Sequence, residues 1–310
     1  MYTRRARLGL VRQSDATTPG DPAQALVVPF TGTPTVNPNQ AILVDDAIRG
    51  TLSKRYRTFE GVKQPEVNFE SYAMPDIVGA LLFGILGSDA VTGTGPYQHV
   101  IVPAWDPPYW TVYRYSDVSN GDLRIVGLRI ASVEISWNTA EGLVTVSTNG
   151  QGLDFEQGDW PLQDPSADTI IRGWQVSVQI DGNDYSAVNG TIRFTRDMER
   201  VYLGRGNTRA DMMVEDAITV EVDLSALYDT AQALANAMDQ STTHALAIRM
   251  VDQATNEEIR VEIPKYQMAR EPVGFDLGSL VEKINVNGTA VHNDAGAFVT
   301  ATVVNNIASY

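Results

Sequence analysis

Hydrophobic and polar residues alternate with a period of two along eight segments of the chain. Such alternation predicts strands with one buried and one polar face, typical of antiparallel sheets. The segments are 98–102, 110–115, 129–136, 143–147, 174–180, 218–222, 245–250 and 258–263. Dipeptides that favour tight turns predict hairpins between strands: Asn120-Gly121, Asn149-Gly150, Asp181-Gly182, Asn189-Gly190 and Asn287-Gly288. The pattern indicates a mainly β protein.

Two segments have the spacing of helices instead. Residues 75–86 carry a wide apolar stripe, with Pro75 in the first turn and Gly87 placed to cap the end. Residues 224–238 carry apolar side chains at i, i+3 and i+4. We expect each helix to pack on a sheet through these stripes, which include Leu81, Leu82, Ile85, Leu234 and Met238.

The second half of the chain repeats the plan of the first. A strand runs into a helix at 65–86 and again at 218–238, and a constant register matches Val67 with Val220 and Phe69 with Val222. Each half closes on a similar strand, 143–150 and 280–288. A turn-rich acidic stretch at 154–168 separates them, so we predict two modules, residues 1–160 and 161–310. A doubled module is a natural subunit for a ring.

The composition and motifs of the chain exclude several kinds of functional site. The chain has 310 residues, 43% of them hydrophobic, and no cysteine, so it forms no disulfide or thiolate metal site. His99, His244 and His292 have no metal-ligand spacing, and we expect each on the surface. There is no Gly-x-Ser-x-Gly elbow or phosphate-binding Gly-Lys-Ser/Thr motif, and the longest apolar run, 77–86, is too short to span a membrane. We therefore predict no catalytic residue, cofactor or metal, no contact with membranes, and a protein that is not an enzyme.

The formal net charge is −15. Proteins that hold DNA by its phosphates need clustered Lys and Arg, so this balance argues against a DNA-binding protein. Two interpretations of this acidity remain open. An acidic surface keeps many proteins soluble, and it also suits a surface that faces DNA without binding it.

Two basic segments stand out against this acidity. The first lies in an expected projecting hairpin at about 41–65, and its counterpart precedes the strand of the second half. Such projections suit acidic surfaces of neighbouring copies, although solvated hairpins with local ion pairs explain them equally well. The basic residues are Arg49, Lys54, Arg55, Arg57 and Lys63 in the first segment and Arg193, Arg196, Arg200, Arg205 and Arg209 in the second.

The order of elements resembles that of the major tail tube proteins of long, non-contractile-tailed (siphovirus-like) bacteriophages. The resemblance spans about 41–288 and rests on three segments: the helix from Met74 to Leu82 with Gly87 after it, the start of a strand at Tyr97-Gln98-His99, and the segment 146–152. It implies β-sandwich modules, each with a packed helix, whose inner sheets join between neighbours into a ring-wide β-barrel. The five basic residues of the first segment would then make contacts between stacked rings.

The resemblance also implies partners and a location. The chain would assemble with itself into rings of three duplicated subunits, or alternatively six, that stack into a tube conducting double-stranded DNA during ejection. Other tail proteins (tape measure, tail terminator and distal tail protein) would be partners, and the tube would form in the host cytoplasm and reside in the virion tail.

Two other functions stay open from the residues. An aromatic cluster suits a carbohydrate- or receptor-binding β-sandwich of a baseplate or tail fibre, because bases and sugars stack on such rings. Adjacent carboxylates such as Glu215-Asp216 and Glu257-Glu258 are compatible with a β-rich hydrolase that uses paired carboxylates. The aromatic cluster comprises Trp105, Tyr109, Trp110, Tyr113 and Tyr115.

Overall fold

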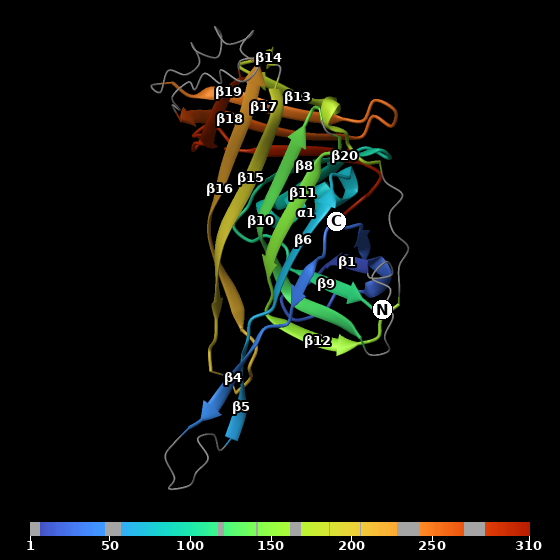
Figure 1. The fold of residues 1–310 in the computed structure, drawn as a ribbon, viewed down its shortest axis with the longest axis vertical. Helices are drawn as coiled ribbons and strands as arrows, with labels where there is room; N and C mark the ends of the chain where they lie inside the picture. Colours follow the sequence, from blue (N-terminus) through green and yellow to red (C-terminus); the bar gives the residue numbers. More distant parts are fainter. Residues whose placement is uncertain are drawn as a thin grey trace.

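The protein is built from two crossing layers of β-strands with a helix between them (Figure 1). The computed structural model describes residues 7–46, 57–116, 121–140, 142–161, 169–185, 187–204, 206–227, 242–269 and 283–310, without the side chains of 226, 227 and 283–286. None of the helices in these ranges has the length and hydropathy to cross a bilayer.

The elements of the first half are β1 (Arg7–Arg12), η2 (Pro22–Gln24), β2 (Leu26–Val28), β3 (Thr35–Asn37), β4 (Gln40–Asp45), β5 (Arg57–Lys63), β6 (Glu66–Tyr72), α1 (Pro75–Leu86), β7 (Gly87–Thr92), β8 (Tyr97–Pro103), β9 (Trp110–Tyr115), β10 (Asp122–Asn138), β11 (Thr145–Gln151) and β12 (Asp154–Gly158). Those of the second half are η3 (Gly173–Gln175), β13 (Val176–Ile180), β14 (Asn183–Tyr185), β15 (Ala187–Val201), β16 (Met212–Leu227), β17 (His244–Val251), β18 (Glu258–Ala269), β19 (Lys283–Ala290) and β20 (Thr300–Asn305).

Strand β10 belongs to both layers of the first half. Its N-terminal part pairs with β9 and β12, and its C-terminal part pairs with β11. One layer therefore has the order β2-β1-β9-β10-β12, and the other has the order β3-β6-β11-β10. In Figure 1 the second of these layers runs along the long axis, and β9 and β12 cross it.

Strand β18 has the same role in the second half. It pairs with β17 and β20 through its N-terminal part and with β19 through its C-terminal part. The two orders are β14-β13-β17-β18-β20 and β15-β16-β19-β18. The pairing order of the second half thus follows that of the first, strand for strand.

Within the described residues, two pairings between strands join the halves. Strand β10 pairs with β15, from Ser132 opposite Thr195 to Asn138 opposite Asn189, so the long-axis layers form one continuous sheet from β3 to β18. Strand β8, from the hairpin β7–β8, pairs with β20 and so extends the crossing layer of the second half. The halves consequently share one hydrophobic core.

Helix α1 is buried along its whole length, which is why its sequence is apolar on every side except at Asp76 in the first turn. Pro75 occupies its first turn, and Gly87 ends it in the left-handed conformation (φ 105°) with its N–H donating to the carbonyl oxygen of Phe83. Leu81, Leu82 and Ile85 are fully buried. The first predicted helix is confirmed to the residue.

The second predicted helix is wrong where it can be compared. Residues Leu224–Leu227 continue β16 and pair with β19. Leu224 is buried there as a strand residue. Its apolar side chains suited either structure, and pairing with β19 decided in favour of the strand. The rest of that segment, with Leu234 and Met238, lies outside the described residues.

Three of the predicted hairpin turns are also wrong. Asn149-Gly150, Asn189-Gly190 and Asn287-Gly288 lie inside β11, β15 and β19, because their glycines make room for neighbouring strands. A Cβ at Gly190, for example, would lie 2.4 Å from the Trp137 ring. Asp181-Gly182 does form the turn between β13 and β14.

Candidate functional site

The continuous sheet has one apolar and one polar face. Side chains such as Val133, Phe194 and Val222 point into the core and are buried. Residues of the opposite parity are partly or fully exposed; in the middle of the sheet they are polar, whereas Met212 and Val214, at the N-terminal end of β16, are exposed apolar side chains. This polar face is formed by Glu66, Asn68 and Glu70 of β6, Ser147 and Asn149 of β11, Ser132, Glu134 and Ser136 of β10, Thr191, Arg193 and Thr195 of β15, and Thr219, Glu221 and Asp223 of β16.

The polar face is acidic. Among its described side chains are five carboxylates and one guanidinium, that of Arg193. Nε of Arg193 donates to Oε2 of Glu134 at 2.8 Å, and its Nη1 lies 3.8 Å from Oε2 of Glu221. The hydrogen bond to Glu134 raises the pKa of Arg193. The single cation therefore stays charged, but neighbouring carboxylates balance its charge.

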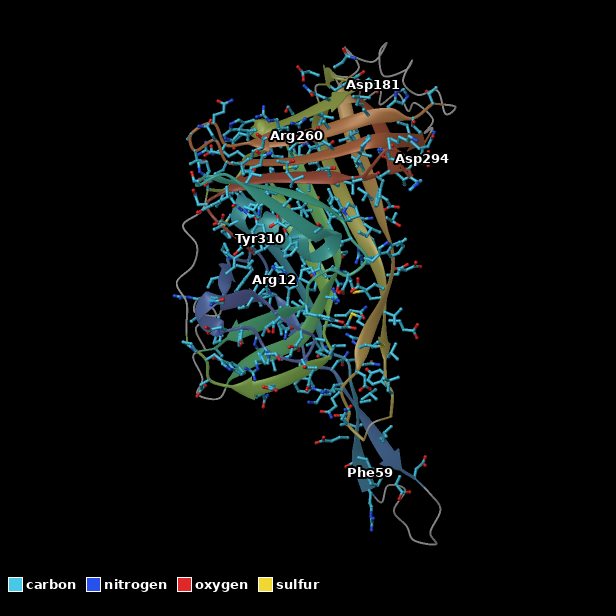
Figure 2. All side chains as sticks on the ribbon, turned by 180° about the vertical axis from the view of Figure 1, so that it is seen from behind. Arg12, Phe59, Asp181, Arg260, Asp294 and Tyr310 are labelled. Atoms are coloured by element: carbon cyan, nitrogen blue, oxygen red, sulfur yellow. The ribbon has the colours of Figure 1, made fainter. Side chains whose placement is uncertain are left out.

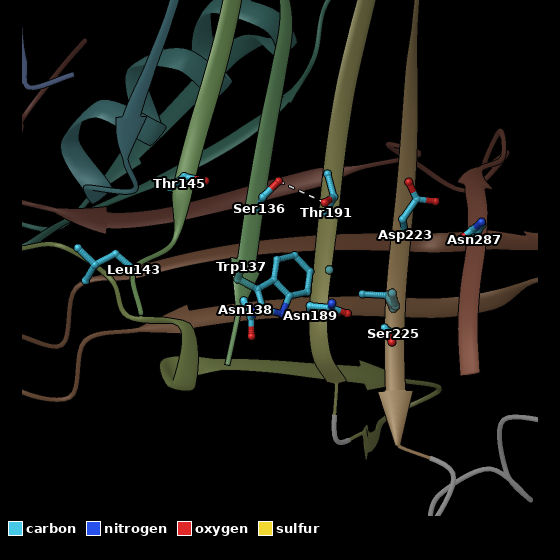
Figure 3. Close-up of a pocket in the computed structure, with 12 residues that line it drawn as sticks. Ser136, Trp137, Asn138, Leu143, Thr145, Asn189, Thr191, Asp223, Ser225 and Asn287 are labelled. Atoms are coloured by element: carbon cyan, nitrogen blue, oxygen red, sulfur yellow. Dashed lines mark hydrogen bonds between the residues drawn. The ribbon is translucent and has the colours of Figure 1, made fainter. Parts of the chain in front are cut away.

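A shallow cavity of about 480 Å³ indents this face across β11, β10, β15, β16 and β19 (Figure 3). Its lining is mostly hydroxyl and amide groups, and Ser136 and Thr191 lie within hydrogen-bond distance of each other at 3.2 Å. Asp223 is the one ionisable side chain among the described lining residues. Such a lining offers weak polar contacts and lacks the paired titratable groups that acid/base chemistry needs.

The hairpin β4–β5 projects from one end of the molecule, opposite the end that carries Asp181 (Figure 2). It pairs with no other strand of the described chain. It exposes large apolar side chains: Leu43 and Phe59 face each other across the strands and are 57% and 51% exposed, and Ile42 is 71% exposed. Arg57 is exposed opposite Asp45, whereas Arg49, Lys54 and Arg55 lie outside the described residues.

Those of the equivalent arginines of the second half that the structure describes do not form a basic projection. Arg196 is 4% exposed and bonded to Glu215, and Arg200 donates to the carbonyl oxygens of Gly152 and Pro65. Burial lowers the pKa of Arg200. Arg209 is half-buried, and Arg205 lies outside the described residues. Arg196 and Arg200 are thus committed within the chain and are unavailable to a neighbouring copy.

A buried ionic group, which pattern reasoning missed, joins the halves. Glu215 lies 2.6 Å from Nη1 of Arg196 and 3.1 Å from Nε of Arg129, and all three side chains are at most 8% exposed. Arg129 also contacts Asp106 at 2.7 Å and the Tyr109 ring at 3.6 Å. Because β10, β15 and β16 each supply one member, the group holds the second-half hairpin against the first half.

The aromatic cluster does not form a stacking platform. Trp110, Tyr113 and Tyr115 are at most 2% exposed, and burial raises the pKa of Tyr115 to about 12. Only Trp105 among the five stands out in solvent, at 92% exposure. A ligand therefore has no access to most of these rings.

Each histidine lies near a carboxylate, and His292, 3.5 Å from Asp294, is exposed. His99 is buried, contrary to our expectation, with Nδ1 2.9 Å from Asp89 and Nε2 2.8 Å from the carbonyl oxygen of Ile307. His244 lies 2.7 Å from Asp181 and 3.3 Å from Oγ1 of Thr242. Across the described ranges, no group of three or more potential ligands could hold a metal ion.

Comparison with known proteins gives one result that covers nearly the whole chain. The model of a family described as phage tail tube protein matches residues 3–301. No curated protein matches the chain.

Proposed function

The chain belongs to the phage tail tube protein family, and from this premise we propose that it self-assembles into stacked rings whose lumen conducts double-stranded DNA. Membership makes it a structural component of the virion tail. We propose a siphovirus-like tail assembled in the host cytoplasm, with tape measure, terminator and distal tail proteins as partners.

We propose that each half, 1–160 and 161–310, is one tube module. The common pairing order supports this, and irregularities in the ladders support it further. The register shifts between Gln40 and Ile42 in β4–β5, and between Arg196 and Met198 in β15–β16. These places correspond when β6 is set on β16. Bulges tend to be kept within families, so shared bulges favour duplication of an ancestral module.

The contact between β10 and β15 supplies a pattern for contacts between chains. It joins the last long-axis strand of one module to the first of the next. In the described residues, β18 ends the continuous sheet on one side and β3 on the other, so a second copy can repeat the same contact there. Ring closure removes such edges. Three chains would give six modules; a ring of six chains is the alternative.

The polar face suits the lumen. Its carboxylates repel phosphates, and the balanced charge of Arg193 leaves no free guanidinium there among the described side chains. Binding to DNA grows with each phosphate that a cation neutralises, so a conduit benefits from having few free cations. The opposite face is filled by the core and is unavailable for this purpose.

The projecting hairpin suits stacking of rings. It extends beyond the body at one end and exposes Leu43 and Phe59. Contact between one end of a subunit and the other end of the next produces an open filament. We propose that this apolar pair supplies much of the stacking energy. Arg49, Lys54, Arg55 and Arg57 remain proposed as charged contacts around it.

The observation that carries the proposal is the continuous sheet, which has the same strand order in both halves and an acidic polar face. Negative-stain electron microscopy of the purified chain tests it. We expect hollow tubes that lengthen with protein concentration. Separate globular particles at all concentrations would overturn the proposal.

A further inference from the structure

The outer edge of β12 is built differently from that of its counterpart, β20. Strand β20 pairs with β18 on one side and with β8 on the other. Strand β12 pairs with β10 on one side, and no strand of the described residues pairs with its other side. An unpaired strand edge presents N–H and C=O groups that attract strands of other chains.

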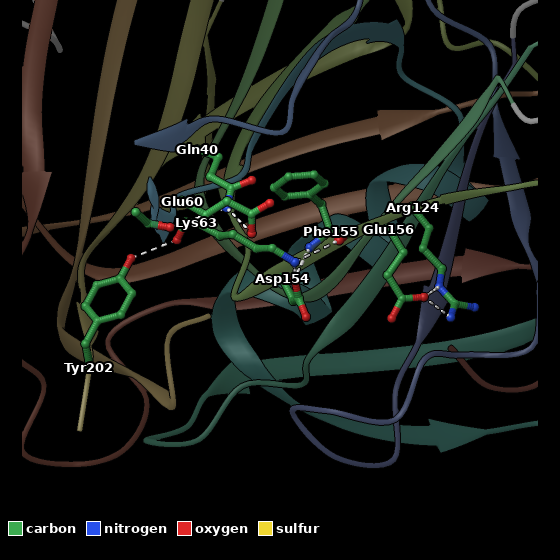
Figure 4. A network of polar contacts seen from close by, with 9 residues as sticks. Gln40, Glu60, Lys63, Arg124, Asp154, Phe155, Glu156 and Tyr202 are labelled. Atoms are coloured by element: carbon green, nitrogen blue, oxygen red, sulfur yellow. Dashed lines mark hydrogen bonds and ion pairs between the residues drawn. The ribbon is translucent and has the colours of Figure 1, made fainter. Parts of the chain in front are cut away.

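Side chains cover the backbone of this edge at Phe155. The N–H of Phe155 donates to Oδ1 of Asp154 at 2.7 Å, and its carbonyl oxygen accepts from Nζ of Lys63 at 3.4 Å. Nζ of Lys63 also lies 2.6 Å from Oδ1 of Asp154 and 4.7 Å from the centre of the Phe155 ring (Figure 4). Both polar groups of Phe155 are thereby satisfied without a neighbouring strand.

Lys63 is firmly held in this position. Its backbone N–H donates to the carbonyl oxygen of Thr208, and its own carbonyl oxygen accepts from the hydroxyl of Tyr202 (Figure 4). These bonds fix the end of β5 against the tip of the β15–β16 hairpin. The side chain of Lys63 therefore reaches β12 from a well-defined base, at only 21% exposure.

We propose that Lys63 and Asp154 close the outer edge of β12 against strand addition by a second copy of this chain. Lysines placed on edge strands are a common protection against unwanted pairing. A second copy is the expected occupant, because the equivalent edge of β20 already takes a strand, β8, from this same sequence. Without the two side chains, the backbone groups of Phe155 are free for strand addition. The protection of this edge acts on the chain before it assembles and so does not depend on tube formation.

A cysteine reporter tests the proposal cleanly, because the chain has no cysteine of its own. Gln157→Cys places a thiol on the exposed outer part of β12. The reporter is combined with Lys63→Met, which keeps the aliphatic stem over Phe155, or with Asp154→Ala. The matched control is Glu156→Gln, which breaks the ion pair of Glu156, also on β12, with Arg124 of β10 and uncovers no backbone group.

The readout is the fraction of cross-linked dimer in the dilute, unassembled chain, with a melting temperature for each variant to confirm folding. We expect a several-fold increase for Lys63→Met and Asp154→Ala over the reporter alone, and no increase for Glu156→Gln. Equal fractions in all backgrounds would overturn the proposal. The measurement needs no tubes, so its failure is distinct from failure of the proposed function.

Discussion

Gly150 and Gly288 occupy corresponding positions in the two halves. Gly150 lies opposite Val67 on one side and Ile130 on the other, and Gly288 lies between Val222 and Met268 in the same way. A Cβ would meet the carbonyl oxygen of Arg129 at 3.0 Å in the first case and that of Gln267 at 2.4 Å in the second. In both halves the three strands approach one another closely at this point, and more closely at Gly288 than at Gly150.

This relationship predicts unequal effects of the same substitution. Gly288→Ala is expected to lower the free energy of unfolding by about 1–3 kcal/mol, as overpacking of a core does, and Gly150→Ala by less. Urea unfolding followed by circular dichroism measures both. Gly296→Ala is the control, because its Cβ would meet nothing within 4 Å. Equal losses at all three positions would contradict the explanation.

The buried ionic group predicts a large loss on neutralising its centre. Glu215→Gln removes the carboxylate that Arg129 and Arg196 share and leaves Arg129 with Asp106, and breaking such a buried pair typically costs about 3–5 kcal/mol. Glu156→Gln, at a half-exposed ion pair, is expected to cost about 0–1 kcal/mol. Denaturant unfolding compares the two, and similar losses would show that Glu215 holds the halves together only weakly.

If the projecting hairpin joins stacked rings, a variant without its apolar pair should fold but should not form long tubes. Leu43→Ser with Phe59→Ser removes an exposed apolar pair, so the melting temperature should hardly change while tube growth, followed by light scattering and microscopy, stops. Thr58→Ala on the other face of the hairpin is the control. Since apolar contacts resist salt screening, growth of the unaltered chain should persist in concentrated salt. Tubes of normal length from the double variant would contradict this role.

If the acidic polar face lines the lumen, lysines placed on it should make the tube bind passing DNA. Glu66→Lys with Glu70→Lys adds free cations to the proposed lumen, and assembled tubes should then retain double-stranded DNA in a salt-dependent manner. Asp184→Lys, on the crossing layer, adds a cation elsewhere and should have no such effect. Filter retention at several salt concentrations measures it. Equal retention by both kinds of variant would place the lumen on another surface.

Because Tyr115 is buried, we expect the fold to lose stability at alkaline pH. Burial raises the pKa of Tyr115 from 10.0 to about 12, so its neutral form stabilises the fold below pH 10. That contribution is lost as the pH rises from 10 through 12. Tyr115→Phe should therefore lose less stability than the unaltered chain over this range. Parallel denaturant midpoints from pH 9 to 11.5 check it, and identical pH profiles would contradict it.

The sequence predicted strands and the first helix well because period and capping are local signals. Alternation marked 110–115, and the structure has β9 at Trp110–Tyr115. Asn-Gly pairs misled because a glycine that suits a turn also suits a crowded strand crossing. The sequence alignment of the halves set Val67 on Val220, whereas the pairing around the two glycines sets it on Val222; a shift of two leaves the alternation unchanged.

The candidate site was less accessible to pattern reasoning. Acidity was visible in the composition, but only strand pairing brings Glu66, Glu134 and Glu221 to one face. The basic segments predicted charged projections, yet Lys63, Arg196 and Arg200 turn inward to partners that are distant in sequence. Long-range partners of this kind leave no periodic signal, and the exposed apolar pair Leu43 and Phe59 drew no notice beside them.

The number of chains in one ring tests the central claim most directly. If each chain supplies two modules, cryo-electron microscopy of tubes, or mass measurement on released rings, should show three chains arranged with pseudo-sixfold symmetry. Six chains in a ring would contradict it.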